Sequence, residues 1–208
     1  MNKKKAIGLF VVILLLTIVT MPATPAFAQG SGFTETFDEA ELSGWEYSQD
    51  VSVEDGALKI FGGNFAIRFG DWSDITLDVR LRFTPSGEVV VNYYMGPTGT
   101  YSLIIPGEVL ILEKNANGTN TVLAEAALTG FTPGEWGDLQ VVVENGTHTI
   151  SWNDTVIITV TDPEPLSSGS IQLLAFGEIT AEFDSLTLTG TPGEGMPPEG
   201  GEPGPEGG

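Results

Sequence analysis

The feature that most constrains the fold of this chain is the alternation of apolar and polar residues along it. From residue 51 to residue 189 the patterned segments repeat with a period of two and are rich in Val, Ile, Thr, Phe and Tyr. This period is typical of a strand with one buried face, whereas an amphipathic helix repeats every 3.6 residues. The pattern predicts about thirteen strands, at 51–53, 57–61, 65–69, 75–83, 88–95, 100–105, 109–113, 121–126, 138–144, 147–152, 155–161, 169–176 and 182–189.

Short polar connections separate these strands. Glu54-Asp-Gly, Asn117-Gly, Asn145-Gly and Asn153-Asp contain the residue types that adopt the positive φ of tight hairpins. Many short strands joined by such turns are typical of an antiparallel sandwich, since a parallel sheet needs long crossover connections. The predicted fold class is therefore an all-β, two-sheet sandwich.

The two ends of the chain differ from this middle part. Residues 1–28 combine three lysines near the start, an apolar run and the tripeptide Ala26-Phe27-Ala28, which together predict a secretory signal peptide cleaved after Ala28. Residues 191–208 consist almost wholly of Pro, Gly and Glu and predict a disordered acidic tail. Residues 29–190 form the predicted domain. We expect a secreted, extracellular protein with no membrane anchor after signal cleavage.

The charge of the predicted mature chain excludes some partners. Without its first 28 residues the chain keeps 5 basic and all 28 acidic residues, a formal charge of −23. Such a charge repels nucleic acid and anionic lipid, so we expect no nucleic-acid partner. The chain contains no cysteine, which excludes disulfides, thiolate metal sites and a cysteine nucleophile.

The order of several segments resembles the concanavalin A-like lectin and glucanase superfamily. The segments are TFDEAELSGWEY, VSVEDGALKI, DITLDVRLRF, GEWGDLQVVVENGTHTISWNDTVIITVTD and EFDSLTLTG. Together they resemble the branch that includes laminin-G-like and 3-keto-disaccharide hydrolase domains, over about residues 33 to 190. The resemblance implies a jelly-roll sandwich of two antiparallel sheets, one of them curved, with a carbohydrate site on the concave face or at one rim.

No complete catalytic motif is present. A retaining glucanase needs an acid and a nucleophile about 5 Å apart, and members of this superfamily carry two glutamates around an aspartate on one strand. The nearest match is Glu182-Phe183-Asp184-Ser185-Leu186-Thr187, where Thr187 occupies the position of the second glutamate. We therefore predict no catalytic residue, and expect His148, the only histidine, to have no catalytic or metal role.

Two acidic residues form a candidate cation site. Asp38 stands near the first strand of the domain and Asp184 on the last, and first and last strands are usually neighbours in such sandwiches. Carboxylate oxygens suit Ca²⁺. A structural Ca²⁺ is thus possible, although no cofactor is expected to be required, and two exposed acids are the alternative.

Three of the five mature basic residues fall in two successive predicted strands, which makes them a candidate ligand surface. The alternation places Asp78, Arg80 and Arg82 on the outer face, and Arg68 opposite Phe65, Ile67 and Phe69. If Asn92 and Tyr94 join the arginines, the face suits sugar hydroxyls or an acidic glycan. A salt-bridged surface is the alternative. The candidate ligand-binding residues are Arg68, Trp72, Asp78, Arg80, Arg82, Asn92 and Tyr94.

The four tryptophans receive different predictions. Trp45 and Trp136 are expected in the core, and Trp152 at least half buried. Trp72 lies in a predicted loop between the two arginine strands and is the expected aromatic contact of a ligand.

These observations favour a secreted, non-catalytic, lectin-like carbohydrate-binding module whose partner is a glycan or polysaccharide. Two alternatives stay open. One is a glycoside hydrolase of the 3-keto-disaccharide hydrolase type, with Asp78, Glu88 or Glu182 lining a pocket beside the arginines. The other is an extracellular structural or adhesive sandwich with a broad apolar patch that binds another protein.

Overall fold

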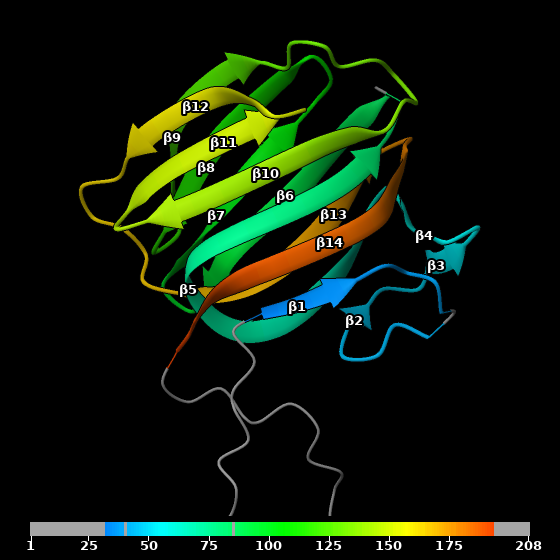
Figure 1. The fold of residues 1–208 in the computed structure, drawn as a ribbon, viewed down its shortest axis with the longest axis horizontal. Coiled ribbons are helices and arrows are strands. Elements are labelled where there is room, and N and C mark those ends of the chain that lie inside the picture. The colour runs from blue at the N-terminus through cyan, green and yellow to red at the C-terminus, as the bar shows by residue number, and fades with distance from the viewer. Residues whose placement is uncertain (1–31, 40, 85, 194–208) are drawn as a thin grey trace, which may run out of the picture.

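The computed structural model describes residues 32–39, 41–84 and 86–193, which form a two-layer β-sandwich (Figure 1). The predicted signal peptide, residues 1–28, and most of the predicted tail, residues 191–208, lie outside this part. Within it no helix has the length and apolar character needed to cross a membrane.

Fourteen strands lie in the described part, all paired antiparallel. They are β1 Gly32–Glu35, β2 Glu46–Tyr47, β3 Val51–Glu54, β4 Ala57–Phe61, β5 Asn64–Arg82, β6 Gly87–Gly96, β7 Gly99–Ile105, β8 Val109–Ala116, β9 Thr119–Ala127, β10 Gly137–Glu144, β11 Thr147–Trp152, β12 Thr155–Thr161, β13 Gly169–Gly177 and β14 Thr180–Pro192.

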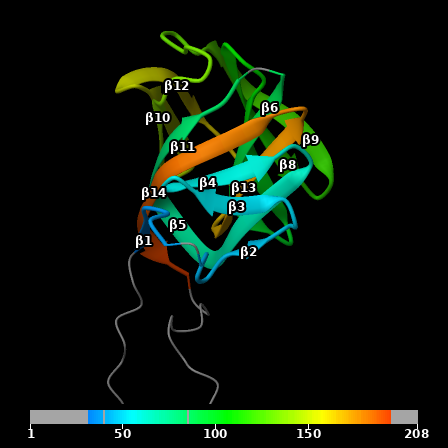
Figure 2. The ribbon, with the colours of Figure 1, turned by 90° about the vertical axis from the view of Figure 1, so that its right-hand side faces the viewer.

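The strands form two layers that share β5. The layer that we call sheet A has the order β12-β11-β10-β5-β14, and β1 and β4 pair with the far edge of β14. Sheet B has the order β2-β5-β13-β6-β7-β8-β9. Figure 2 shows the two layers from the side, with β10 to β12 on one flank and β6, β8 and β9 on the other. The fold is a jelly-roll sandwich, as predicted.

Strand β5 passes from one layer into the other. Its residues 64–72 pair with β13 in sheet B, and residues 76–81 pair with β10 in sheet A. The prediction of two strands separated by a loop at residues 70–73 is therefore wrong, because the chain stays extended through 19 residues. Asp74, at φ 44°, is the one residue of β5 with a positive φ, and the register of β5 against β13 also shifts between Arg68 and Trp72.

The irregularity at Asp74 reverses which residues of β5 face the interior. Before it, Ala66 and Trp72 are buried; after it, Ile75 and Leu77 are buried. Even-numbered residues thus face the core in sheet B and odd-numbered residues face it in sheet A. A single alternating pattern read across residues 65–83 cannot reproduce this change of phase.

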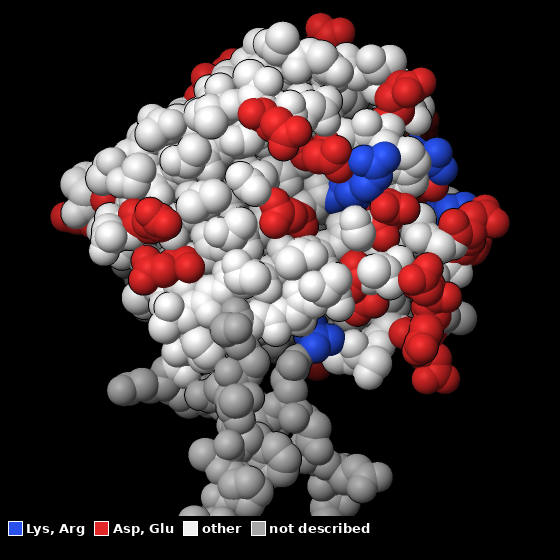
Figure 3. Space-filling model, viewed as in Figure 1, with Lys and Arg blue, Asp and Glu red and all other residues white. Residues whose placement is uncertain are grey.

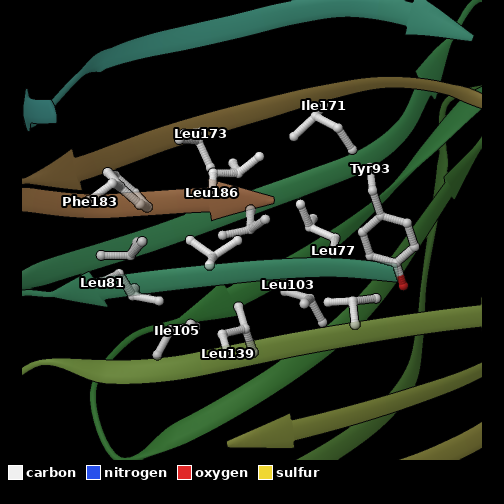
Figure 4. Close-up of a cluster of buried hydrophobic side chains, with 14 of the residues drawn as sticks. Leu77, Leu81, Tyr93, Leu103, Ile105, Leu139, Ile171, Leu173, Phe183 and Leu186 are labelled. Carbon is white, nitrogen blue, oxygen red and sulfur yellow. The ribbon is translucent and has the colours of Figure 1, made fainter. Parts of the chain in front are cut away.

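The core lies between the two sheets. Leu77 and Leu81 from sheet A face Leu103 and Leu173 from sheet B, and none of the four is exposed to solvent (Figure 4). Burying an aliphatic side chain of this size contributes about 1.5–3 kcal/mol. With no disulfide available, this packing is the main source of stability.

The first and last strands are neighbours, as predicted. Gly32 pairs with Thr189, and Glu35 pairs with Leu186. Strand β14 extends to Pro192 and so includes the first two residues of the expected tail. The described chain therefore begins and ends at the same corner of the sandwich (Figure 1).

Candidate functional site

Asp78, Arg80 and Arg82 lie on the outer face of sheet A, as predicted, but both arginines are paired with acids. Arg80 Nη1 is 2.9 Å from Asp138 Oδ1 and its Nε is 3.6 Å from Asp184 Oδ2. Arg82 Nη2 is 2.7 Å from Glu182 Oε2. The salt-bridged alternative thus describes this surface.

The tryptophan beside these arginines is Trp136. It is half-buried, so the prediction that it lies in the core is wrong. The guanidinium of Arg82 lies 4.5 Å from the centre of its ring and that of Arg80 lies 5.8 Å away. Cation–π contacts of this kind cover the ring. Figure 3 shows basic groups near the upper right of the face with acidic groups around them, and a further basic group apart from them lower in the view.

Arg68, Trp72 and Tyr94 do not join this surface, and their predicted exposure on it is wrong. Arg68 pairs across the strands with buried Ile171, so it lies on the inner side of sheet B, where it donates to Ser43 O at 2.7 Å and stacks over Phe33. Trp72 is 2% exposed. It lies in β5 just before the change of phase at Asp74, in a segment that the sequence pattern had placed in a loop.

Tyr94 is buried because β6 has its own irregularity. Its backbone has φ 52°, so Tyr94 turns inward beside Tyr93 and their rings pack edge to face at 5.7 Å. Burial raises the pKa of Tyr94 to about 12. Tyr94 is a core residue and offers no aromatic plate to a ligand.

Asn92 is the predicted residue that faces outward from sheet B. Its neighbours Val91 and Tyr93 point into the core, yet Asn92 itself is only 9% exposed. Its Nδ2 donates to Gln172 Oε1 at 2.9 Å. The buried Oδ1 of Asn92 has no hydrogen-bond partner, which is costly unless a ligand or solvent supplies a donor.

Asn92 belongs to a row of polar side chains that crosses four strands. In register, Gln172 of β13 is opposite Asn92 of β6, which is opposite Ser102 of β7, which is opposite Glu113 of β8. We call these four residues the polar row. Sequence reasoning missed three of its members because the register, which brings together residues far apart in the chain, cannot be read from alternation alone.

An apolar row runs beside the polar row on the same face. Leu174 is opposite both Phe65 and Val90, Val90 is opposite Ile104, and Ile104 is opposite Ile111. Val90 is only 6% exposed although it points away from the core. The outer face of sheet B thus has a recessed apolar floor with hydrogen-bonding groups along one side.

A cavity of about 590 Å³ opens at one end of this face. Its wall includes Phe69, whose ring is 57% exposed. The lining also includes Met95, Pro97 and residues that carry hydroxyl or carboxylate groups, namely Asp71, Thr98, Ser167, Ser168 and Ser170.

A second cavity, of about 540 Å³, lies at the rim of the sandwich where β14 begins. We call it the rim cavity. The Arg82–Glu182 ion pair lines it together with Phe61, Thr84, Glu178 and Thr180. A smaller cavity of about 150 Å³ contains Asp78 and Arg80. Two acids that sequence reasoning placed beside the arginines, Asp78 and Glu182, therefore do line cavities next to them.

The candidate cation ligands Asp38 and Asp184 have other contacts. Thr36 donates a hydrogen bond of 2.7 Å to Asp38, and Asp184 faces Arg80. Among the residues that the structure describes, no group of three or more His, Asp or Glu side chains could hold a metal ion. The Ca²⁺ site stays a prediction.

His148 lies in the interior between the sheets, with no exposed surface. Its Nδ1 is 2.7 Å from the hydroxyl of Tyr93. Burial lowers the pKa of His148 from 6.5 to about 4, against the opposing effect of the Asp162 carboxylate. The imidazole is therefore neutral near pH 7 and is a packed core group.

Comparison with protein families agrees with this fold. The family described as the 3-keto-alpha-glucoside-1,2-lyase-like domain matches residues 32–189. The chain belongs to this family. The match begins with β1 and ends within β14, three residues before that strand ends, so nearly the whole sandwich corresponds to the lyase-like domain. The comparison with curated proteins found no match.

Solved structures show the same fold as this lyase-like domain. The carbohydrate binding module CBM66 from Bacillus subtilis is 18% identical, with a TM-score of 0.60 over 70% of this chain and 95% of that one. A β-1,3-1,4-glucanase from a mouse hindgut metagenome is 12% identical, with a TM-score of 0.67 over 77% and 99%. The β-glucanase of Bacillus licheniformis is 12% identical, with a TM-score of 0.64 over 78% and 99%.

Proposed function

We propose that this protein is a secreted, non-catalytic carbohydrate-binding module that holds a glycan on the outer face of sheet B. The observation that carries the proposal is the polar row beside a recessed apolar row. Sugars have apolar C–H faces and hydroxyl edges, so a glycan lying on this face would contact both rows. The family and the fold, shared with a carbohydrate binding module, support the same class of ligand.

Binding is tested by isothermal titration of the purified protein with soluble polysaccharides. We expect saturable heat with at least one of them and no release of sugar products. Asn92→Leu removes the unpartnered acceptor and should weaken binding about tenfold, the effect of about 1.4 kcal/mol. Gln140→Leu, on the outer face of sheet A, is the matched control and should bind as the parent does. Absence of binding to every polysaccharide would exclude the proposal.

Secretion is tested separately by sequencing the amino terminus of the protein from culture supernatant. We expect the mature chain to start at Gln29, directly after Ala28. An intact Met1 on the exported protein would exclude cleavage of the signal peptide.

A second candidate function is lyase chemistry at the rim cavity, favoured by the family match and by the Arg82–Glu182 pair in its lining. A lyase acting on a 3-keto glucoside must take a proton from the carbon beside the ketone, after which the group on C1 leaves. Glu182 is the candidate base, and Arg82 would stabilise the negative charge that forms on the ketone oxygen.

The lyase candidate is tested by incubating the protein with 3-keto glucosides and measuring the released aglycone. Turnover that Glu182→Gln abolishes and Asp138→Asn preserves would support it. Both variants remove a partner of a surface arginine, so their comparison separates catalysis from a general effect of breaking an ion pair. No turnover by the parent protein would exclude this candidate.

A further inference from the structure

The outward positions of sheet B carry no basic side chain among the described residues. The five basic residues of the described part of the chain all lie away from this face. Lys59 pairs with Glu54, and Arg68 contacts Ser43 and Phe33. Arg80 and Arg82 lie on sheet A, and Lys114 points into the core towards Asp162. A bound anion on sheet B would therefore find no Lys or Arg to neutralise it.

The charged residues of this face are acidic. Glu113 is a member of the polar row, Glu125 is opposite Ile111 at the end of the apolar row, and Glu88 is opposite Phe176 on the β6 side. The overall formal charge of −20 for the whole chain adds to the repulsion of anions. A uronic-acid or sulfated chain placed on the two rows would meet carboxylates and no counter-charge.

The hydrogen-bonding groups of the polar row need donors from a ligand. The Oδ1 of Asn92 is buried without a partner, while its Nδ2 is already bonded to Gln172. The carboxylate of Glu113 only accepts hydrogen bonds, and the hydroxyl of Ser102 both donates and accepts. Hydroxyl groups satisfy this combination, whereas a carboxylate on the ligand would place two acceptors against each other.

The shape of the face also limits how the ligand lies. The polar row runs from β13 through β6 and β7 to β8, three inter-strand spacings of about 4.8 Å, or roughly 14 Å in all. The apolar row follows the same direction beside it. A chain with one apolar side and one hydroxyl-bearing edge contacts both rows only when it lies across the strands.

We infer that the ligand of the sheet B face is an uncharged, extended glycan that runs across the strands, with a hydroxyl group donating to Asn92 Oδ1. This inference rests on the proposed carbohydrate-binding function and adds the charge class and direction of the ligand. It replaces the sequence-based expectation of an arginine-lined site for sugar hydroxyls or an acidic glycan.

The test compares uncharged polysaccharides with uronic-acid polysaccharides by affinity electrophoresis and titration, at low and at high salt. We expect the uncharged chains to bind with an affinity that salt does not change, and the acidic chains not to bind. Oligosaccharides should gain affinity with length until they fill the polar row and then stop gaining.

Two variants sharpen the result. Glu113→Lys introduces a basic group into the polar row and should admit acidic chains in a salt-dependent manner. Asp78→Lys makes the same change of charge on the outer face of sheet A and is the matched control, which should leave acidic chains unbound. Circular dichroism of each variant checks that the fold is retained.

The outcomes separate the two levels of the argument. Preferential binding of acidic chains, weakened by salt, would overturn the inference about charge while carbohydrate binding itself stands. Binding of uncharged chains that Asn92→Leu and Glu113→Lys leave unchanged would overturn the placement on sheet B. No binding to either class would overturn the proposed function and the inference with it.

Discussion

Lys114 and Asp162 form an ion pair of 2.7 Å inside the sandwich, where their side chains are 11% and 4% exposed. Tyr101 donates a hydrogen bond of 2.6 Å to the same carboxylate, and the Lys114 ammonium also donates to the Glu164 carbonyl. Burial disfavours the carboxylate, but these donors hold the pKa of Asp162 below its usual range. The pair joins β8 to the connection between β12 and β13.

Removing the cation alone should be strongly destabilising. Lys114→Met leaves Asp162 as an uncompensated buried charge. We expect the variant to lose about 3–5 kcal/mol of unfolding free energy, the typical cost of breaking a buried ion pair. Urea unfolding followed by tryptophan fluorescence measures the loss. The double variant Lys114→Met with Asp162→Asn removes both charges and should recover part of it. If Lys114→Met were as stable as the parent protein, the ion pair would not stabilise the core.

The neutral, buried His148 makes stability depend on pH. Its pKa is about 4 in the folded state and 6.5 when unfolded, so the unfolded state binds the proton first as the pH falls. The stabilisation that the neutral histidine provides is complete above pH 6.5 and declines as the pH falls from 6.5 to 4. The difference between the two pKa values corresponds to about 3 kcal/mol of unfolding free energy. Unfolding free energies measured across this range should show the decline.

His148→Gln isolates that contribution, because His148 is the only histidine in the chain. Glutamine does not titrate and its amide oxygen can still accept a hydrogen bond from Tyr93. We expect a shallower decline between pH 6.5 and 4 than in the parent protein. Loss of stability from protonation of carboxylates, Asp162 included, continues below this window in both proteins. Parallel curves for the two proteins would contradict a buried neutral histidine.

A substitution at Gly70 should show that the indole of Trp72 is a core group. A Cβ on Gly70 would lie 2.1 Å from Trp72 Cη2, so Gly70→Ala must displace the ring and should cost about 1–3 kcal/mol. Gly96→Ala is the matched control, since a Cβ there meets no atom within 4 Å. Thermal unfolding measures both. Equal melting temperatures for the two variants would mean that the indole is not fixed in the core.

Arg80→Ala should have little effect on stability or on glycan binding. The guanidinium of Arg80 is exposed and its partners Asp138 and Asp184 are exposed as well, and such surface pairs contribute about 0–1 kcal/mol. Titration with the best polysaccharide ligand and urea unfolding provide the two measurements. A loss of glycan affinity larger than tenfold would move the binding site from sheet B to the arginine surface of sheet A.

The sequence predicts much of the fold because the fold depends on local patterns. Alternation and turn residues predict hairpins such as β3–β4, where Glu54-Asp-Gly stands between the strands, and Asp55 and Gly56 do have positive φ. The fold class and the pairing of the first and last strands are confirmed. Each of these depends on neighbouring residues or on a general rule of sandwich topology.

The candidate site was harder to predict because it depends on phase and register. Asp74 and Tyr94 each have a positive φ. At each of them the alternation of inward and outward side chains along the strand changes phase. Arg68, Trp72 and Tyr94 were misplaced for this reason. Gln172 lies 80 residues from Asn92 in the chain and meets it only through the pairing of β13 with β6. Ser102 and Glu113 join the row through the registers of two successive hairpins, which the alternation of apolar and polar residues does not fix.

The antiparallel pairing of β1 with β14 has a mechanical consequence. Gly32 and Thr189 are opposite each other at the corner where the described chain begins and ends, so tension applied to both ends would pull across the strands. Their hydrogen bonds would then break one after another, as in a zipper, and the sandwich would open at low force. Tension on one end alone, with a ligand held on sheet B, would load many bonds of the sandwich together.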